Sequence, residues 1–462
     1  MRYRHHGRSF VVAAIPVVTT LVIFFGRTHL FPIGGDEPHY LVIADSIVSD
    51  RDVNLKNNYE RDAQTGVIYG PVEPHVYRLP TAWIPYHGAG LPLLTALPFA
   101  AGGERAVRVA LCVFAGLLPW ALMRWLQSLV GTGTAGWLVT GVLLAPPILF
   151  GSTQIYPDLP AGVLATALAC WLLIRSDRTA EDDVPSRWPW LLFWLAGGYL
   201  PWLNLKFAPA TLALAAGGLG LVWRWRSEHV REAERRLAAW TLPFVALAPL
   251  LLIAFNLSTS GTWIGLRGGA ELTHSPGRAL MILAGLHVDQ SQGMFFAQPL
   301  LAAGVAAFVP FAAIRPRLAL FWAALYASLI VPNSLELARY GLGGPAGRFA
   351  WSAMWLWIVP IGVALAFAGD RLTRCVRAAV LGVLAYQAAL AVRWTYIPQV
   401  LFTHVDPPRD SPFPDALVPW LPSFYTWDFT GYLRDGANQA AFAVVVLLLA
   451  AGWFLVRRTR PC

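Results

Sequence analysis

Two carboxylates and a histidine lie close together in the segment GGDEPHY, residues 34–40. Asp36 and Glu37 follow the first long apolar run of the chain, so we expect them at a membrane surface. The low dielectric constant of such a boundary raises the pKa of a carboxyl group, and the carboxylate becomes a stronger base. This segment is therefore a candidate for taking a proton from an acceptor hydroxyl. The alternative is that Asp36 or Glu37 caps a helix that begins at Pro38.

A polar run between residues 52 and 59 follows, rich in amide, lysine and tyrosine side chains. Such groups are suited to hydrogen bonds with sugar hydroxyls, although a solvated turn would have the same composition. The candidates for substrate binding in this part of the chain are His39, Tyr40, Lys56 and Asn58.

A third carboxylate, Asp158, lies in the segment QIYPDLPAG between two prolines, with apolar sequence on both sides. A charged residue there is costly unless it faces protein or water. Three roles are open: Asp158 could hold an acceptor, assist Asp36, or bind a divalent cation. The alternative is a cap at the start of the next helix.

Two basic residues are candidates for binding phosphate. Lys206 is one of only two lysines, Lys56 being the other, in a chain that otherwise uses arginine. At the end of an apolar run it could bind a lipid-linked phosphate as a compact point charge, or extend to the membrane interface. Arg348 follows a turn rich in glycine and proline, and its guanidinium could bind phosphate through two hydrogen bonds.

Further candidates lie toward the C-terminus. Asp289 and Tyr340 each precede an apolar run and are predicted to contact substrate, whereas His287 is interpreted as a hydrogen-bonded structural residue. A proline-rich stretch near residue 420 carries four aromatic side chains. They are typical of an aromatic belt at the membrane interface, and could also stack on sugar rings: Trp420, Phe424, Tyr425 and Trp427.

The elements that must position these residues follow from composition. Of 462 residues, 56% are hydrophobic and 13% charged, and the mean hydropathy is +0.52. Soluble domains carry about 25% charged residues, so a soluble enzyme is excluded, and the abundance of aromatic residues excludes a disordered chain. The fold class is therefore an all-α polytopic membrane protein, formed as one membrane-embedded domain over 1–462. We expect about twelve transmembrane helices, near residues 9–26, 106–124, 134–151, 159–174, 190–205, 208–223, 237–256, 293–313, 318–332, 350–368, 378–392 and 438–456.

The distribution of Lys and Arg predicts the orientation. Basic residues concentrate in short loops such as RWRSEHVREAERR and DRLTRCVR, which the positive-inside rule places in the cytoplasm together with both termini. Two long loops, residues 27–105 with the acidic motif and residues 393–437, then lie outside, and the stretch 88–101 lies at the interface or forms a re-entrant segment. The four cysteines show no paired spacing, so we expect neither a disulfide framework nor a cysteine metal site. The net charge of +9 is accounted for by these loops rather than by nucleic acid, which we do not expect as a partner.

In this order the motifs resemble the GT-C superfamily of integral-membrane glycosyltransferases, in particular bacterial members similar to protein O-mannosyltransferases and aminoarabinose transferases. The segments that carry the resemblance are GGDEPHY, YPDLP, LKFAP, DQSQG and GGPAGRF, spread over residues 34–349.

The resemblance implies a GT-C-like fold in the bacterial cytoplasmic (inner) membrane, an active site on its outer face and membrane lipids as partners. It implies inverting transfer of a hexosyl or pentosyl group from a polyprenyl-phosphate-linked sugar to a glycan, lipid or protein acceptor. Asp36 matches the general base, Glu37 completes the family's acidic pair, and Asp158 corresponds to the second-loop carboxylate. Lys206 and Arg348 match basic positions near the donor phosphate. The resemblance fixes no cofactor: a divalent cation is possible, and the metal ligands are left open.

Two other classes of protein have similar sequence features. A twelve-span transporter would explain the apolar runs, but not a long loop between the first two spans or the carboxylates at one face. An oligosaccharide ligase or polymerase would use a polyprenyl-linked glycan on the same side of the membrane. Unlike protein O-mannosyltransferases, the chain has no soluble domain inserted among its spans, which weighs against a protein acceptor.

Overall fold

The computed structural model describes residues 3–27, 33–65, 72–177, 187–225, 232–266, 272–273, 275–336, 339–341, 345–396, 413–414, 416–424 and 435–459. The chain divides into two compact units, each assembled from separated stretches of sequence. Unit 1 combines residues 1–32, 115–153 and 272–462, and unit 2 combines residues 33–114 and 154–271.

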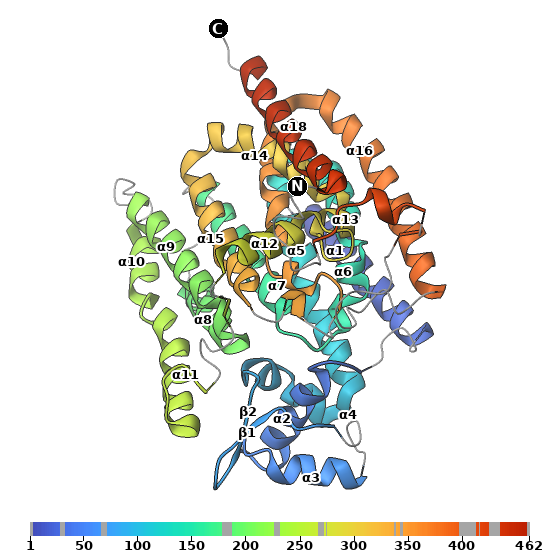
Figure 1. Cartoon of the computed structure of the whole chain (residues 1–462). Coiled ribbons are helices and arrows are strands. Elements are labelled where there is room, and N and C mark those ends of the chain that lie inside the picture. Colours follow the sequence, from blue (N-terminus) through green and yellow to red (C-terminus); the bar gives the residue numbers. More distant parts are fainter. Residues whose placement is uncertain are drawn as a thin grey trace. The chain divides into compact units, whose positions relative to one another are not determined.

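Unit 2 holds the first polar motif and the segments around Asp158 and Lys206. Figure 1 shows its helices α9, α10 and α11 beside α8. Its elements are α2 (Glu37–Ser49), α3 (Lys56–Thr65), β1 (Val76–Arg78), β2 (Trp83–Pro85), α4 (Gly90–Ala115), α7 (Asp158–Asp177), α8 (Arg187–Leu203), η4 (Leu205–Phe207), α9 (Ala208–Arg224), α10 (Glu232–Thr241) and α11 (Phe244–Ser260).

Unit 1 is built around α14, which packs against α15, α16 and α18, while α1 and α16 pack against α5. Its helices are α1 (Tyr3–Gly26), α5 (Leu117–Leu143), α6 (Pro146–Leu149), α12 (Pro276–Val288), α13 (Met294–Ala297), α14 (Ala303–Ile314), α15 (Pro316–Leu335), α16 (Ile358–Tyr396) and α18 (Gly436–Thr459). Short 3₁₀ turns complete it: η2 (Gly151–Thr153), η7 (Pro299–Ala302), η8 (Arg339–Gly341), η9 (Arg348–Ala350), η10 (Met354–Trp357) and η12 (Val418–Trp420).

The helices confirm the predicted class of membrane protein. Among the described residues, seven helical segments are long and apolar enough to cross a membrane, and three shorter apolar helices accompany them. Every one of the twelve predicted spans lies mainly on helix. The apolar runs therefore located the helices, because about 20 apolar residues are needed to cross the hydrocarbon core.

One predicted loop is wrong. Residues 369–377 were expected to connect two spans in the cytoplasm, but α16 runs through them as one helix of 39 residues. Such a helix is about 58 Å long, whereas the hydrocarbon core is about 30 Å thick. The charges in DRLTRCVR interrupt the apolar run without ending the helix, since this stretch contains no proline. The prediction for residues 393–437 assumed that the chain crosses the membrane twice between residues 350 and 392, with a loop between the crossings. Because α16 has no such loop, the side of the membrane on which residues 393–437 lie has to be tested separately from the side on which residues 27–105 lie.

The first long polar loop is a folded structure. We refer to its residues 33–65 and 72–89 as the polar segment. Its helices α2 and α3 and the hairpin β1–β2, the only strands in the described part of the chain, enclose a small hydrophobic core. That core comprises Val42, Ile43, Leu55, Tyr59 and Val76. Burial of these apolar side chains gives the segment a fixed shape on which polar groups can be positioned.

The predicted orientation can be tested by labelling with an impermeant maleimide in intact cells. In a background without Cys375 and Cys462, a cysteine at exposed position 60 should react, because the polar segment is predicted to lie outside. A cysteine at position 236 on α10 should react only after the membrane is permeabilised. The reverse pattern would contradict the predicted orientation.

Candidate active site

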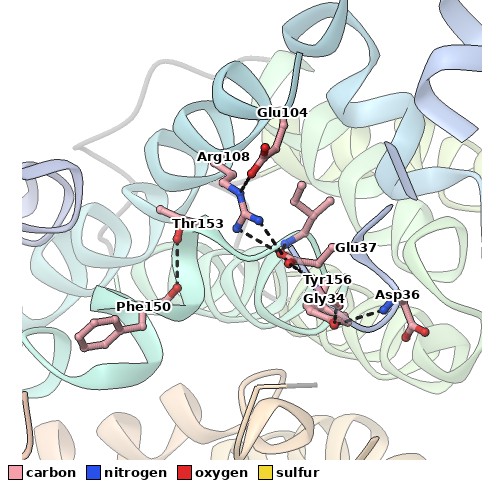
Figure 2. Close-up of polar contacts among 9 residues, drawn as sticks. Gly34, Asp36, Glu37, Glu104, Arg108, Phe150, Thr153 and Tyr156 are labelled. Carbon is pink, nitrogen blue, oxygen red and sulfur yellow. Dashed lines mark hydrogen bonds and ion pairs between the residues drawn. The ribbon is translucent and has the colours of Figure 1, made fainter. Parts of the chain in front are cut away.

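Asp36 occupies the N-cap position of α2, but its side chain does not cap that helix. The chain turns into this position at Gly35, whose φ of +57° favours a residue without a Cβ atom. The backbone N–H of Asp36 donates to the hydroxyl of Tyr156 at 3.3 Å, and that hydroxyl donates to the carbonyl of Gly34 at 2.9 Å. These bonds fix the backbone while the Asp36 carboxylate points away from Glu37 (Figure 2). Helix capping by the side chain therefore does not account for Asp36.

Two histidines of the polar segment face the Asp36 carboxylate. His75 directly precedes β1 and His87 follows β2, so antiparallel pairing brings both to the same end of the hairpin. Nδ1 of His75 lies 3.8 Å and Nε2 of His87 lies 3.7 Å from Oδ1 of Asp36. The two ring nitrogens are 3.2 Å apart. These three atoms are close enough together to hold one metal ion.

A third histidine, His39 on α2, supports this cluster from behind. Its ring stacks on that of His75 with the centroids 3.7 Å apart and the planes 18° from parallel. Nδ1 of His39 is hydrogen-bonded to the hydroxyl of Tyr59 at 2.7 Å. Burial, together with the neighbouring His75 and His87, lowers the pKa of His39 to about 3, so its ring is neutral at pH 7.

Glu37 faces the opposite way and is completely buried (Figure 2). Its carboxylate pairs with the guanidinium of Arg108 on α4 at 3.2 Å, and accepts hydrogen bonds from the N–H groups of Ile155 at 2.8 Å and Gly34 at 3.2 Å. Arg108 also donates to Glu104 at 2.6 Å. Burial raises the pKa of Glu37 above its ordinary value. The Arg108 charge and the two backbone N–H groups offset part of this rise. Glu37 thus joins the turn before α2 to α4 and to the chain before α7.

Asp158 and Lys206, which we predicted as separate candidates, form an ion pair. Nζ of Lys206 lies 2.8 Å from Oδ1 of Asp158, and both side chains are at least nine-tenths buried. Asp158 begins α7, and Lys206 lies in η4, where the side chain of Asn204 accepts a hydrogen bond from the Lys206 N–H. The pair places a positive charge at a fixed point beside a carboxylate.

The polar segment and the start of α4, which directly follows it, contact the chain on both sides of this ion pair. Tyr156, which binds the backbone of Asp36, lies two residues before Asp158. Gly90, at the start of α4, lies directly against the backbone of Trp202, four residues before Lys206. The hydroxyl of Tyr199 also donates to the carbonyl of Gly90 at 2.7 Å. The cluster of Asp36, His75 and His87 and the Asp158–Lys206 pair are therefore built on adjoining parts of unit 2.

The Gly90 contact yields a prediction. A Cβ atom at this position would overlap the Trp202 carbonyl, which is backbone and cannot rotate away. Gly90→Ala should therefore destabilise the protein by on the order of 3 kcal/mol, the upper end for overpacking. Thermal unfolding of the purified protein measures this effect. Gly133→Ala is the matched control, since a Cβ atom at Gly133 meets open space, and an equal melting temperature for the two variants would contradict the prediction.

The other predicted residues of the polar segment lie in different surroundings. Tyr40 is buried with its ring centroid 4.9 Å from that of His87, so it belongs to the wall of the cluster. The amide of Asn58 donates to Asp45 at 3.1 Å and to Asp50 at 2.7 Å, which ties α3 to α2. Lys56 is exposed at the start of α3.

In unit 1 the predicted site residues hold loops together. Asp289 accepts hydrogen bonds from the N–H groups of Ser291, Gln292 and Phe424 at 2.7–2.8 Å, and the hydroxyl of Tyr340 donates to the Phe424 carbonyl at 3.1 Å. Arg348 is buried and donates to the carbonyl of Gly341 at 2.8 Å. His287 is hydrogen-bonded to the Leu283 carbonyl and the Tyr326 hydroxyl, which confirms its interpretation as a structural residue. Of the four aromatic candidates, Trp420 is exposed and Phe424 is buried, while Tyr425 and Trp427 lie outside the described residues.

Sequence reasoning missed His75, His87, Arg108 and Tyr156. A signal was present for the two histidines, because they flank VYRLPTAWIPY, in which a proline-containing turn separates two short runs with β-branched or aromatic residues. No comparable signal marks Arg108, whose partner lies 71 residues earlier in the chain.

Comparison with known proteins gives one match. No protein-family model and no curated protein matches the sequence. The chain is similar to the crystal structure of ArnT from Cupriavidus metallidurans bound to undecaprenyl phosphate, with 15% sequence identity and a TM-score of 0.49, over 96% of this chain and 76% of that chain. A likeness at this level assigns neither a family nor an activity, so the function proposed below is supported by the chain's own residues.

Proposed function

We propose that the chain is a GT-C-type membrane glycosyltransferase. It moves a hexosyl or pentosyl group from a polyprenyl-phosphate donor to an acceptor hydroxyl, on the extracytoplasmic face and with inversion at the anomeric carbon. The observation that carries the proposal is the pairing of two features in unit 2. A partly exposed Asp36 carboxylate, which is not used to cap its helix, is built beside the segment that holds the Asp158–Lys206 pair.

The proposed step needs one base and one cation. Asp36 takes the proton of the acceptor hydroxyl, whose oxygen forms a bond to the anomeric carbon from the face opposite the phosphate. The bond between that carbon and the phosphate oxygen breaks, and its electron pair stays on the departing polyprenyl phosphate. A cation held near that oxygen stabilises the charge that develops there.

Lys206 is the cation that we assign to the donor phosphate. Asp158 holds the Lys206 ammonium at 2.8 Å, so the charge is oriented before the substrate binds. Preorganisation of this kind lowers the cost of stabilising charge in the transition state. Asp158 thus serves as a positioning residue for Lys206, a role that was not among those considered from the sequence.

The remaining site residues divide into two groups. Glu37 is completely buried and paired with Arg108, so we assign it a positioning role rather than the catalytic one implied by the resemblance. Two sets of assignments remain predictions. Arg348 is predicted as a second phosphate ligand, and the predicted substrate contacts are His39, Tyr40, Lys56, Asn58, Asp289 and Tyr340. Each is testable by substitution in the assay below.

The experiment is the release of free polyprenyl phosphate from a panel of synthetic polyprenyl-phosphate sugars, with a membrane extract as the source of acceptor. Wild-type protein should release the lipid phosphate from one donor. Lys206→Met should raise the KM for that donor and lower kcat, together by about 100-fold in kcat/KM, the effect of one charge-stabilising donor. Arg105→Met, which removes an exposed positive charge on α4, should match wild type. Failure to release lipid phosphate from any donor would contradict the proposal.

A further inference from the structure

We propose that His75, His87 and Asp36 form a binding site for one divalent transition-metal ion, with Zn²⁺ the best-suited occupant. The two histidines come from the same end of the hairpin, and Asp36 comes from the turn before α2. Neither His75 nor His87 was a candidate from the sequence motifs. The site is a property of the folded polar segment.

The spacing of the three ligand atoms fits a metal ion. The separations of 3.2, 3.7 and 3.8 Å form a nearly equilateral triangle. The circle through its corners has a radius of about 2.1 Å, so an ion near the centre would lie within bonding distance of all three atoms, since Zn–N and Zn–O bonds are about 2.0–2.2 Å long. No large movement of the side chains is needed.

The surrounding residues hold the ligands in this arrangement. The N–H of Tyr86 donates to the carbonyl of His75 at 3.0 Å, which continues the β pairing up to the ligands. On the other side, the ring of His39 stacks on His75 and is itself fixed by its hydrogen bond to Tyr59. Neighbours that orient metal ligands in this way are typical of metal sites.

The chemistry of the ligands selects the class of ion. Two imidazoles and one carboxylate suit Zn²⁺ and neighbouring ions such as Co²⁺ and Ni²⁺, whereas Mg²⁺ and Ca²⁺ prefer oxygen ligands. Three protein ligands also leave a fourth position of a tetrahedral ion open, as in catalytic zinc sites. Access exists on this side, because the side chains of Asp36 and His75 are 28% and 38% exposed.

The consequence for the reaction rests on the proposed function. An ion bound to Oδ1 of Asp36 would offer its open position to an acceptor oxygen and make that hydroxyl more acidic. The site would therefore recognise the acceptor, while the ion pair in the same unit is assigned to the donor.

The first test measures the metal content of purified protein. After chelation and dialysis against Zn²⁺, wild type should retain about one equivalent, and His87→Ala below about one tenth of that, because losing one of three ligands weakens binding strongly. Glu73→Gln removes an exposed carboxylate just before His75 and should keep the full equivalent. Dialysis against Mg²⁺ should leave wild type without bound metal.

The second test gives a gain of signal and does not depend on a weakened variant. His75→Cys should still bind Co²⁺ and should show a new sulfur-to-cobalt charge-transfer band, because a thiolate replaces one imidazole in the ligand set. Wild type loaded with Co²⁺ should show the visible bands of a tetrahedral ion without that charge-transfer band.

The outcomes distinguish an error in the proposed metal site from an error in the proposed function. Wild type that takes up no Zn²⁺, full metal content in His87→Ala, or the absence of a charge-transfer band in a folded His75→Cys would each overturn the metal site. The histidines would then be hydrogen-bonded to each other only. Metal binding without release of lipid phosphate from any donor would leave the site intact and contradict the glycosyltransferase.

Discussion

Replacing Asp36 with asparagine should slow sugar transfer by about 10²–10⁴-fold, the contribution of one general base. The amide has nearly the same size as the carboxylate but cannot accept the proton of an acceptor hydroxyl. The side chain does not cap α2, so the substitution should leave the helix and the melting temperature nearly unchanged. Release of polyprenyl phosphate and thermal unfolding of the same preparation measure the two effects.

The control for this substitution is Glu60→Gln, which changes an exposed carboxylate of the same segment in the same way and should retain full activity. A second control distinguishes the role of Asp36 as the general base from its role as a metal ligand. Wild type freed of metal keeps the carboxylate, so it should lose less activity than Asp36→Asn. Equal losses would mean that Asp36 acts only as a metal ligand, and full activity of Asp36→Asn would exclude it as the base.

The helices of this protein were predictable because the physics that forms them is local. An apolar run of about 20 residues is required wherever the chain crosses a membrane, and each predicted run lies mainly on helix. The error at residues 369–377 has the same origin. The prediction equated charge with a loop, whereas a helix continues through charged residues when no proline or strained glycine breaks it.

The candidate site was predictable in its parts but not in its pairings. Asp36, Asp158 and Lys206 stood out because charged groups are rare beside apolar runs. That Lys206 pairs with Asp158 depends on how α7 and α8 pack, which no residue spacing expresses. His75 and His87 became visible only when the hairpin was formed, since its register brings together residues twelve positions apart.

Replacing Glu37 with glutamine should destabilise unit 2 by about 3 kcal/mol, because it removes one partner of a buried ion pair and leaves the Arg108 charge less compensated. The one carbonyl oxygen of glutamine can still accept the hydrogen bond from Ile155, although the bond from Gly34 to the second oxygen is lost, so the turn before α2 should persist at low temperature. Below the new melting temperature, kcat should fall with little change in the KM for the donor, since Asp36 is displaced while Lys206 is not. Thermal unfolding and steady-state kinetics measure the two effects.

The double variant Glu37→Gln with Arg108→Met distinguishes positioning from catalysis. Replacing both members of a buried pair costs less than removing one, so this variant should be more stable than the sum of the single changes implies. If Glu37 only positions the turn, the restored stability should bring back part of the lost kcat. If Glu37→Gln were as stable as Glu60→Gln and yet inactive, Glu37 would itself be the proton acceptor, because a carboxylate lost without structural cost can affect the rate only through its chemistry.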